Sequence, residues 1–481
     1  MTKSYSFAVV FHILIIFSSI SSFASVETKN GDREMRLELF HRHYYMDDVS
    51  APKNQYDKVK DLVQDDLIRV RMVSSRTSRY HYDGKVGKDS SAIIITSTKA
   101  SNDKASSAVL PISSAAYKGI GQYFVQFRVG TPSKKFTLIV DTGSDLTWIN
   151  CRYRCKKCTS RTRMNDHRIF QAGRSFSFKT IPCSSNLCKN LTFSLVTCPS
   201  KRDPCQYDYG YQDGSTAHGF YAYETVTMSL TNGRKTRVHG VPIGCSYSTS
   251  TGTLGSVDGV LGLGYNDNSF ATKATAKFGN NFSYCLVDHL SPKNVSSYLT
   301  FGYSKNLVSG SSPPTNLQFT NIQAIDGLYH VNIVGISIAG LVLKIPSEIF
   351  SFQNQGGVIL DSGSSLTFLA EPAYKIVMKY LMAAFTKFKQ VKDESFEFCF
   401  QSQGFNESAV PKLVFHFADS VRFEPHVKSY VIDVSDGVKC LGFMPNAWPG
   451  ISVIGNIMQQ NFLWEIDLKW KRLGFAPSTC T

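Results

Sequence analysis

The alternation of hydrophobic and polar residues predicts that most of this chain forms β-strands. From about residue 116 onward, short runs of β-branched and aromatic residues end in turn-forming residues. Two examples are 122–129 and 136–140, which are followed by Gly-Thr-Pro and Asp-Thr-Gly. Such runs are typical of strands. The clearest helical pattern covers 371–388, with Pro372 near its start, where proline is favoured. The pattern predicts an all-β body with few short helices.

The N-terminal residues carry the pattern of a targeting segment. Lys3 precedes an apolar stretch from Phe7 to Ile20, and the small-x-small triplet Ser22-Phe-Ala24 follows. A stretch of this length suits the core of a signal peptide, and no apolar run in the chain reaches the roughly 18 residues of a membrane span. We predict a signal peptide over 1–24, entry into the secretory pathway, an extracellular or vacuolar location, and no membrane partner.

Residues 25–115 contain no cysteine and many charges, unlike the body that follows. A helical face is predicted within them from apolar residues spaced mostly three or four apart: Val59, Leu62, Val63, Leu67 and Val70. The stretch from Ser74 to Ser114 is rich in Ser, Thr, Lys and Gly, which is typical of a linker. The segment 25–115 is therefore predicted to be a removable propeptide with its linker. The alternative is a flexible N-terminal arm.

One motif occurs twice, once in each half of the body. The halves, 116–315 and 316–481, meet at a Ser/Pro-rich stretch over 309–315. Each copy is an apolar strand that runs into Asp-[Thr/Ser]-Gly-Ser and then into Leu-Thr and an aromatic residue. The first copy contains Asp141, Thr142, Gly143, Ser144 and Trp148, and the second contains Asp361, Ser362, Gly363, Ser364 and Phe368. A single Asp-Thr-Gly is explained by turn formation alone. Two copies with matched flanks indicate a shared function.

The internal symmetry indicates which reaction the repeated motif performs. Two lobes that meet about a pseudo-two-fold axis would bring Asp141 and Asp361 together at the ends of buried strands. Two carboxylates so close cannot both ionise, so the pair shares one proton and titrates as a unit. The charged carboxylate can take a proton from water while the protonated one polarises a carbonyl group. We therefore predict hydrolysis of amide bonds by an activated water.

These motifs resemble those of the pepsin-like aspartic proteases, and among them the plant nepenthesin-type and atypical members. The resemblance covers nearly the whole chain and includes the segments 258–264, 282–290 and 455–461. It implies an all-β, bilobal pepsin-like fold with pseudo-two-fold symmetry. It also implies an aspartic endopeptidase. Our hypothesis is that the segment 25–115 keeps this enzyme inactive as a zymogen, with basic side chains near the dyad before its release. Such an enzyme would act on protein or peptide substrates as a monomer, without a cofactor or metal.

The resemblance implies roles for individual residues around the catalytic pair Asp141 and Asp361. The supporting residues would be Thr142, Gly143, Ser144, Ser362, Gly363 and Ser364. The hydroxyl after each aspartate would brace the opposite loop, and the serine two residues later would donate to the outer oxygen of its own aspartate.

A predicted hairpin completes this set. Asp213-Gly214 lies between two alternating runs, which is a strong hairpin signal. The resemblance implies that Tyr211 is the tyrosine of a flap that closes over substrate, with Trp148 as its hydrogen-bond partner. A surface hairpin without a further role is the alternative.

The twelve cysteines are even in number and clustered, which indicates disulfides and an oxidising compartment. Seven of them lie in an insert over 151–205, as in nepenthesin-type enzymes. Cys155-x-x-Cys158 has a spacing suited to zinc, but no second such pair accompanies it, so disulfides are favoured. The resemblance implies a disulfide between Cys399 and Cys440, and the other pairings stay open. Four Asn-x-Ser/Thr tripeptides predict glycosylation at Asn190, Asn281, Asn294 and Asn406.

Composition and charge add one competing function. At 42% hydrophobic and 19% charged residues, the chain of 481 residues can form a sizeable core, so global disorder is excluded. The body is basic, with 36 Lys and Arg against 24 Asp and Glu from residue 116 onward. A solvated surface is the ordinary explanation. The alternative is a catalytically weak binding protein whose basic insert recruits nucleic acid or an acidic partner. A plastid is the alternative to the secretory location. Scattered basic residues bind phosphate non-specifically, so nucleic-acid binding is expected to be secondary.

Overall fold

The computed structural model describes most of the body and a few residues ahead of it. The described ranges are 108–114, 122–153, 168–189, 195–211, 216–230, 234–249, 257–267, 269–288, 291, 297–302 and 317–480, preceded by 56, 59–60, 63, 66–67 and 70. All of them belong to one compact unit, Arg33–Thr481. The predicted signal peptide lies outside the described residues.

The first half is built on a sheet that ends in a crossed arrangement of strands. Strand β3 (Lys134–Asp141) runs parallel to β11 (Gly259–Gly262), which is antiparallel to β4 (Trp148–Arg152). Strand β4 in turn runs parallel to β10 (Lys235–Thr249). The apolar residues of these short strands are buried on both faces, as their continuous hydrophobic runs predict.

The second half repeats this arrangement strand by strand. Strand β18 (Val358–Leu360) runs parallel to β27 (Ser452–Ile454), which is antiparallel to β19 (Thr367–Ala370), which runs parallel to β26 (Phe443–Asn446). Both copies of the Asp motif therefore follow the same type of strand in the same surroundings. The predicted all-β fold with internal symmetry is confirmed.

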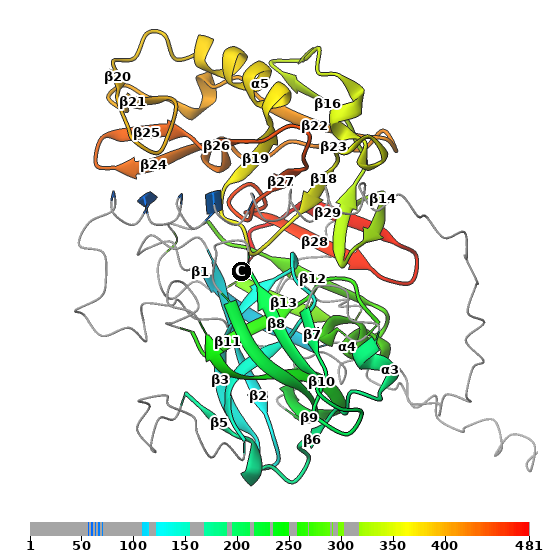
Figure 1. Ribbon diagram of the computed structural model, residues 1–481. Coiled ribbons are helices and arrows are strands. Elements are labelled where there is room, and N and C mark those ends of the chain that lie inside the picture. The colour runs from blue at the N-terminus through cyan, green and yellow to red at the C-terminus, as the bar shows by residue number, and fades with distance from the viewer. Residues whose placement is uncertain are drawn as a thin grey trace, which may run out of the picture. The chain divides into compact units, whose positions relative to one another are not determined.

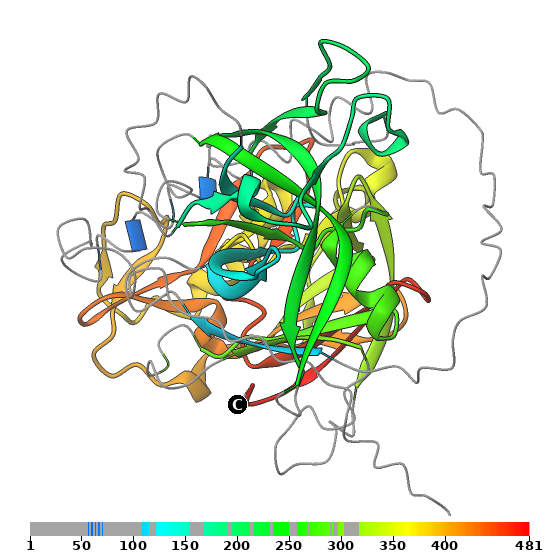
Figure 2. The ribbon, with the colours of Figure 1, turned by 90° about the horizontal axis from the view of Figure 1, so that it is seen from below.

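A continuous row of strands joins the two halves. It runs β1 (Ala108–Ser114), β13 (Ser297–Phe301), β12 (Asn281–Cys285), β28 (Phe462–Asp467), β29 (Arg472–Pro477) and β14 (Gln318–Ile325), each antiparallel to the next. Figure 1 shows these strands where the elements of the first half meet those of the second. Viewed from below, the long green strands of the first half cross in front of the yellow and red second half (Figure 2).

The remaining elements surround these sheets. In the first half they are β2 (Tyr123–Val129), β5 (Phe170–Gln171), η3 (Ala172–Arg174), β6 (Lys179–Thr180), α3 (Asn186–Lys189), β7 (Leu195–Thr197), β8 (Gln206–Gly210), β9 (Thr216–Ser229) and α4 (Phe270–Phe278). In the second half they are β15 (Leu328–Val331), β16 (Ile333–Ile338), β17 (Leu341–Val342), η5 (Ser347–Phe350), η6 (Phe352–Asn354), α5 (Glu371–Ala383), β20 (Gln390–Val391), β21 (Cys399–Gln401), η7 (Glu407–Ala409), β22 (Leu413–Phe417), β23 (Arg422–Phe423), η8 (Val427–Ser429), β24 (Val431–Ser435) and β25 (Val438–Leu441).

The core extends through both halves without interruption. One buried cluster contains Tyr123 and Phe127 of the first half together with Trp464 and Phe475 of the second. The hydroxyl of Tyr123 donates to the carbonyl of Val287 at 2.9 Å and accepts from the side-chain amide of Gln460 at 3.0 Å. Burial of these large side chains favours one joined body rather than two separable ones.

Five disulfides connect the described residues. They join Cys151 to Cys245, Cys183 to Cys198, Cys188 to Cys205, Cys285 to Cys480, and Cys399 to Cys440. The last is the pairing that the resemblance implied. The zinc-like pair Cys155 and Cys158 lies outside the described residues, as does most of the basic part of the insert.

Two predicted boundaries differ from the structure. The helix predicted over 371–388 ends at Ala383, because Phe385 and Phe388 pack against Phe400, with ring centroids 4.7 and 5.0 Å away. The stretch predicted as linker contains β1 at its C-terminal end, where the run Ala-Val-Leu-Pro-Ile pairs with β13. Among the described residues, no helix is long and apolar enough to cross a membrane.

Candidate active site

The two motif aspartates lie at equivalent ends of equivalent strands. Asp141 is the last residue of β3, and Asp361 directly follows β18. Their side chains are buried, with 1% and 0% of each residue exposed. An apolar strand that ends in Asp, followed by Gly, leaves the carboxyl group at the edge of the sheet while the chain turns away.

Each carboxylate is held by its own loop in the same way. The backbone N–H of Gly143 donates to Asp141 Oδ1 at 3.0 Å, and the Ser144 hydroxyl donates to Oδ2 at 2.6 Å. In the second loop the equivalent contacts of Gly363 and Ser364 with Asp361 measure 2.8 and 2.6 Å. These hydrogen bonds fix the orientation of each carboxylate.

The two loops also hold each other. The Thr142 hydroxyl accepts from the backbone N–H of Ser362 at 2.8 Å and donates to the carbonyl of Leu360 at 3.3 Å. In return the Ser362 hydroxyl accepts from the N–H of Thr142 at 3.1 Å and donates to the carbonyl of Val140 at 3.2 Å. All four bonds are buried, so each loop satisfies backbone groups that the other loop leaves open.

The two loops lie so close together that the carboxylate of Asp361 lies against Gly143 of the first loop. A Cβ atom at Gly143 would lie 2.7 Å from Asp361 Oδ1 and 2.9 Å from Oδ2, closer than such atoms can come. Only glycine therefore fits at this position. Because Gly143 also binds Asp141 through its N–H, the two carboxyl groups face a common space.

Behind each loop, a glycine at the end of β11 or just after β27 permits an equally close approach of the backbone. A Cβ at Gly262 would lie 2.7 Å from the backbone carbon of Asp145, and one at Gly455 would lie 2.0 Å from the carbonyl oxygen of Leu366. These glycines end β11 and directly follow β27, the strands parallel to β3 and β18. The close packing keeps the loops in place from behind.

The tyrosine predicted for the flap contacts the predicted tryptophan. Tyr211 directly follows β8, which forms a hairpin with β9, and the indole N–H of Trp148 donates to its hydroxyl. Both side chains are buried, and their rings lie 6.4 Å apart. The turn at Asp213 and Gly214 lies outside the described residues.

Two supporting groups were not predicted from the sequence. Asp145 accepts from the Tyr209 hydroxyl at 3.1 Å and from the Asn266 side-chain amide at 2.8 Å, so it ties the hairpin to the first loop. The sequence signal for Asp145 is a difference between the two copies of the motif, because the second copy has Ser365 at the equivalent position. Tyr284 is the other group. Burial, and then the charge of Asp361, raise the pKa of Tyr284 well above its ordinary value, so it stays neutral beside the dyad.

The predicted glycosylation sites fall into three groups. Asn190 and Asn294 lie outside the described residues. Asn281 was a wrong candidate for the folded protein, because it is 1% exposed within β12 and leaves no path for a glycan. Asn406 is exposed, and its side-chain oxygen accepts from the hydroxyl of Ser408 in the same tripeptide at 2.9 Å. Glycosylation at Asn406 stays a prediction.

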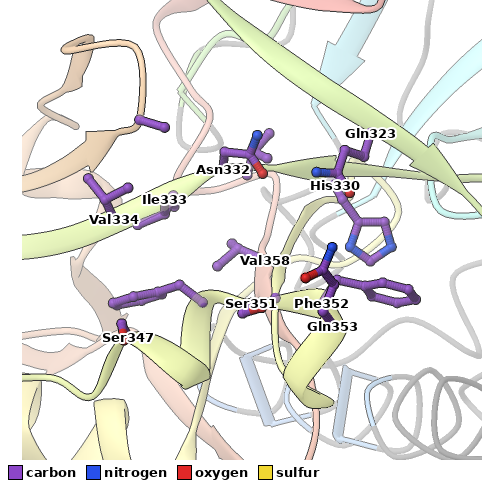
Figure 3. A pocket seen from close by; sticks show the side chains of 14 residues that line it. Gln323, His330, Asn332, Ile333, Val334, Ser347, Ser351, Phe352, Gln353 and Val358 are labelled. Carbon is purple, nitrogen blue, oxygen red and sulfur yellow. The ribbon is translucent and has the colours of Figure 1, made fainter. Parts of the chain in front are cut away.

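A hollow of about 350 Å³ lies in the second half, and none of its lining residues belongs to the two dyad loops. Its walls are β15 and β16 on one side and η5 and η6 on the other, and it includes the buried imidazole of His330. Figure 3 shows His330 opposite Phe352 and Gln353, and the His330 and Phe352 ring centroids are 4.6 Å apart. Neither ring nitrogen of His330 has a hydrogen-bond partner among the described residues. Burial lowers the pKa of His330 to about 4.

Comparison with known proteins agrees with this geometry. The family model described as xylanase inhibitor N-terminal matches residues 123–303, and the one described as xylanase inhibitor C-terminal matches 328–477. Aspartyl protease family protein 2 of Arabidopsis thaliana is 34% identical over 368 residues, which cover 76% of this chain and 72% of that protein. Aspartic proteinase nepenthesin-2 of Nepenthes gracilis is 33% identical and covers 77% of this chain and 80% of its own length.

Solved structures of low sequence identity share the fold. Basic 7S globulin from soybean superposes with a TM-score of 0.61 at 20% identity, covering 78% of this chain and 98% of its own. Conglutin gamma from lupine seeds gives 0.61 at 19% identity, covering 77% and 95%. At this identity the likeness concerns the fold alone.

Replacing Gly143 by alanine is expected to remove the function of the site. The added Cβ must displace the Asp361 carboxylate, because it would lie within 2.9 Å of both of its oxygens. For the peptide hydrolysis that we propose for this site, we expect kcat to fall at least about 100-fold, since small displacements at a reaction centre cost this much. Gly173→Ala is the control, because a Cβ there meets nothing within 4 Å. Equal activity of both variants would contradict this account of the loop contact.

Replacing His330 is expected to change how stability depends on pH. In the unfolded chain this histidine takes up a proton near pH 6.5, whereas in the folded protein it does so only near pH 4. The free energy of unfolding therefore falls as the pH drops from about 6.5 to about 4, by up to about 3 kcal/mol from this residue alone. His330→Phe should make this loss smaller, as measured by urea unfolding at several pH values. The exposed His426→Gln serves as control, and an unchanged slope in His330→Phe would contradict the prediction.

Proposed function

Since this chain belongs to the pepsin-like family of plant aspartic proteases, we propose that it is an active aspartic endopeptidase with Asp141 and Asp361 as its catalytic pair. The observation that carries the proposal is the mutual hydrogen bonding of the two loops through Thr142 and Ser362. Both motifs are complete, and each carboxylate has its own serine and glycine donors. Activation of a water requires both carboxyl groups, whereas a protein retained only for binding would require neither of them.

The proposed reaction uses water as the nucleophile. A water between the two carboxyl groups would give a proton to the charged member of the pair, while the protonated member donates a hydrogen bond to the scissile carbonyl oxygen. The resulting tetrahedral intermediate is not bonded to the protein. It breaks down when a proton passes to the amide nitrogen and the C–N bond cleaves. The proposed mechanism requires one charged and one protonated carboxyl group, and both carboxyl groups lie beside Gly143.

The loops' own donors hold the two carboxyl groups in place. Ser144 and Ser364 each hold one oxygen of their aspartate, and the N–H groups of Gly143 and Gly363 hold the other. These bonds fix the carboxylates before substrate arrives, so little reorganisation is required during the reaction. The β8–β9 hairpin with Tyr211 would cover the bound peptide and exclude bulk water from it.

The setting of this activity is also a proposal. Disulfides within the described residues, a predicted signal peptide and the exposed tripeptide at Asn406 together support folding in the secretory pathway. We propose an extracellular or vacuolar protease that is released from a zymogen by removal of residues ahead of the body.

Replacing Asp141 by asparagine should abolish proteolysis while leaving the fold intact. Asparagine keeps the shape of the side chain but cannot accept the proton from water. We expect the rate of cleavage of a denatured protein substrate to fall below about one-thousandth of that of the wild type between pH 3 and 7. Pepstatin should block the wild-type activity. Asp436→Asn, the same change at an exposed position of the β24–β25 turn, is the matched control and should remain active.

Two results would speak against the proposal. Residual activity of Asp141→Asn near the wild-type rate would point to a contaminating or different catalytic group. Absence of any cleavage by correctly disulfide-bonded, processed wild-type protein would favour the binding-protein alternative instead.

A further inference from the structure

The hollow around His330 has walls that the backbone holds in a fixed shape. Strands β15 and β16 form one wall, and the short helices η5 and η6 form the other. In the second wall, the N–H of Gly356 donates to the carbonyl of Ser351 at 3.0 Å, and the N–H of Gly357 donates to the carbonyl of Ile349 at 2.9 Å. A volume of about 350 Å³ suits a small ligand. The hollow therefore has the size and the preformed walls of a binding site.

Two irregularities of the chain shape the hollow. Gly357, which directly precedes β18, has a φ of 105°, and a Cβ there would lie 3.4 Å from the Cα of Phe352. Glycine thus lets the chain turn from η6 into β18. On the other wall, a β-bulge between Ile333 and Gly335 interrupts the pairing of β16 with β22. Val334 lies in this bulge, lines the hollow and is 60% exposed, so the hollow reaches the surface there. Bulges often redirect a side chain beside a functional site.

His330 places an unpaired polar group in this space. Strand β15 carries it between β14 and β18, where it lies opposite Gln323 and Ile359, and it is 3% exposed. No described residue pairs with its Nδ1 or its Nε2. Buried polar atoms are normally hydrogen-bonded, and one without a partner costs free energy. Because burial keeps the ring neutral, the imidazole offers one donor and one acceptor to a ligand.

Uncharged polar side chains line the hollow on both walls. Two come from the strand side and three from the side of the short helices: Gln323, Asn332, Ser347, Ser351 and Gln353. Figure 3 shows the two groups on opposite sides of the hollow. Amide and hydroxyl side chains can each donate and accept. A ligand that satisfies both walls therefore needs hydrogen-bonding groups on more than one of its sides.

The remaining lining residues limit the charge of the ligand. None of the described residues that line the hollow is Asp, Glu, Lys or Arg. An ion would therefore lose water without gaining a counter-charge, which is costly. Phe350, Val331 and Val358 add apolar surface, and all three are buried. The ligand that fits is uncharged and combines apolar faces with several hydrogen-bonding groups.

We propose that this hollow binds one neutral sugar residue, with the imidazole of His330 hydrogen-bonded to its hydroxyl groups. A sugar ring carries hydroxyls on several sides, each of which can donate and accept, and its C–H groups form apolar faces. A simple amide or alcohol has its polar group at one end only and would leave one wall unpaired. Free monosaccharides and the terminal residues of glycans share this chemistry. The site is separate from the dyad loops, so it does not depend on the proposed proteolysis.

The test measures binding of neutral sugars to the full-length protein by saturation-transfer NMR. The probes are glucose, galactose and mannose, each as the free sugar and as its methyl glycoside, which imitates the terminal residue of a glycan. We expect at least one of them to bind. The corresponding uronate should bind at least about tenfold more weakly, because its carboxylate finds no counter-charge in the hollow. Binding of the glycoside supports a glycan as the source, and binding of the free sugar alone supports a monosaccharide.

Replacement of His330 tests the role of the imidazole. His330→Phe keeps an aromatic ring but removes both nitrogens, and should weaken binding of the sugar at least about tenfold. Val334→Trp provides a second test that leaves the buried wall unchanged. A larger side chain at this exposed bulge narrows the opening and should also weaken binding at least about tenfold. Val342→Trp is the matched control, because Val342 is also 60% exposed but does not line the hollow. It should bind the sugar as the wild type does.

Several results would overturn the proposal. One is the absence of binding of every neutral sugar to the folded wild-type protein. Another is unchanged binding in both His330→Phe and Val334→Trp, which would place the sugar elsewhere on the molecule. Uronates that bind as well as the neutral sugars would contradict the argument from charge. Preferential binding of acetamide would assign the hollow to amide groups instead. None of these results bears on proteolysis, which Asp141→Asn tests separately.

Discussion

The site depends on the exchange of hydrogen bonds between Thr142 and Ser362. Each hydroxyl accepts from a backbone amide of the opposite loop and donates to a carbonyl of the opposite strand. Buried amides and carbonyls are costly when unpaired, so neither loop can hold its shape without the other. The two halves therefore share one site rather than carrying two half-sites, and the glycine turns and bracing strands all serve to bring these hydroxyls into range.

The repeat explains why so much of this could be predicted from the sequence. Two copies of a strand followed by Asp-[Thr/Ser]-Gly-Ser determine both the local structure and the symmetry, because the residues that matter are adjacent in the chain. The pairing of the strands that join the two halves was harder to predict from the sequence. The end of α5 was misplaced because Phe385 and Phe388 stack on Phe400, a contact between segments that local periodicity does not encode. Tertiary packing decided that boundary.

The same reasoning explains what was missed around the site. Asp66 is one of four aspartates close together ahead of the body, and nothing in the sequence distinguishes it from its neighbours. Only packing shows that its carboxylate accepts hydrogen bonds from the backbone amides of Ser365 and Leu366, some 300 positions away. Asn281 was misjudged for the converse reason. Its tripeptide is a local signal, whereas its burial within β12 follows from strands far away in the chain, β13 and β28.

Strand β1 places a constraint on how the chain can be shortened. It pairs along five residues with β13 and so covers what would otherwise be the outer edge of the sheet that joins the halves. A cut at residue 115 would leave the N–H and C=O groups of β13 open to pairing with another molecule, and open edges of this kind promote aggregation. Removal of residues ahead of the body would preserve this pairing only if the cut falls before Ala108. The length of chain kept ahead of residue 115 thus affects the solubility of the protein as well as its stability.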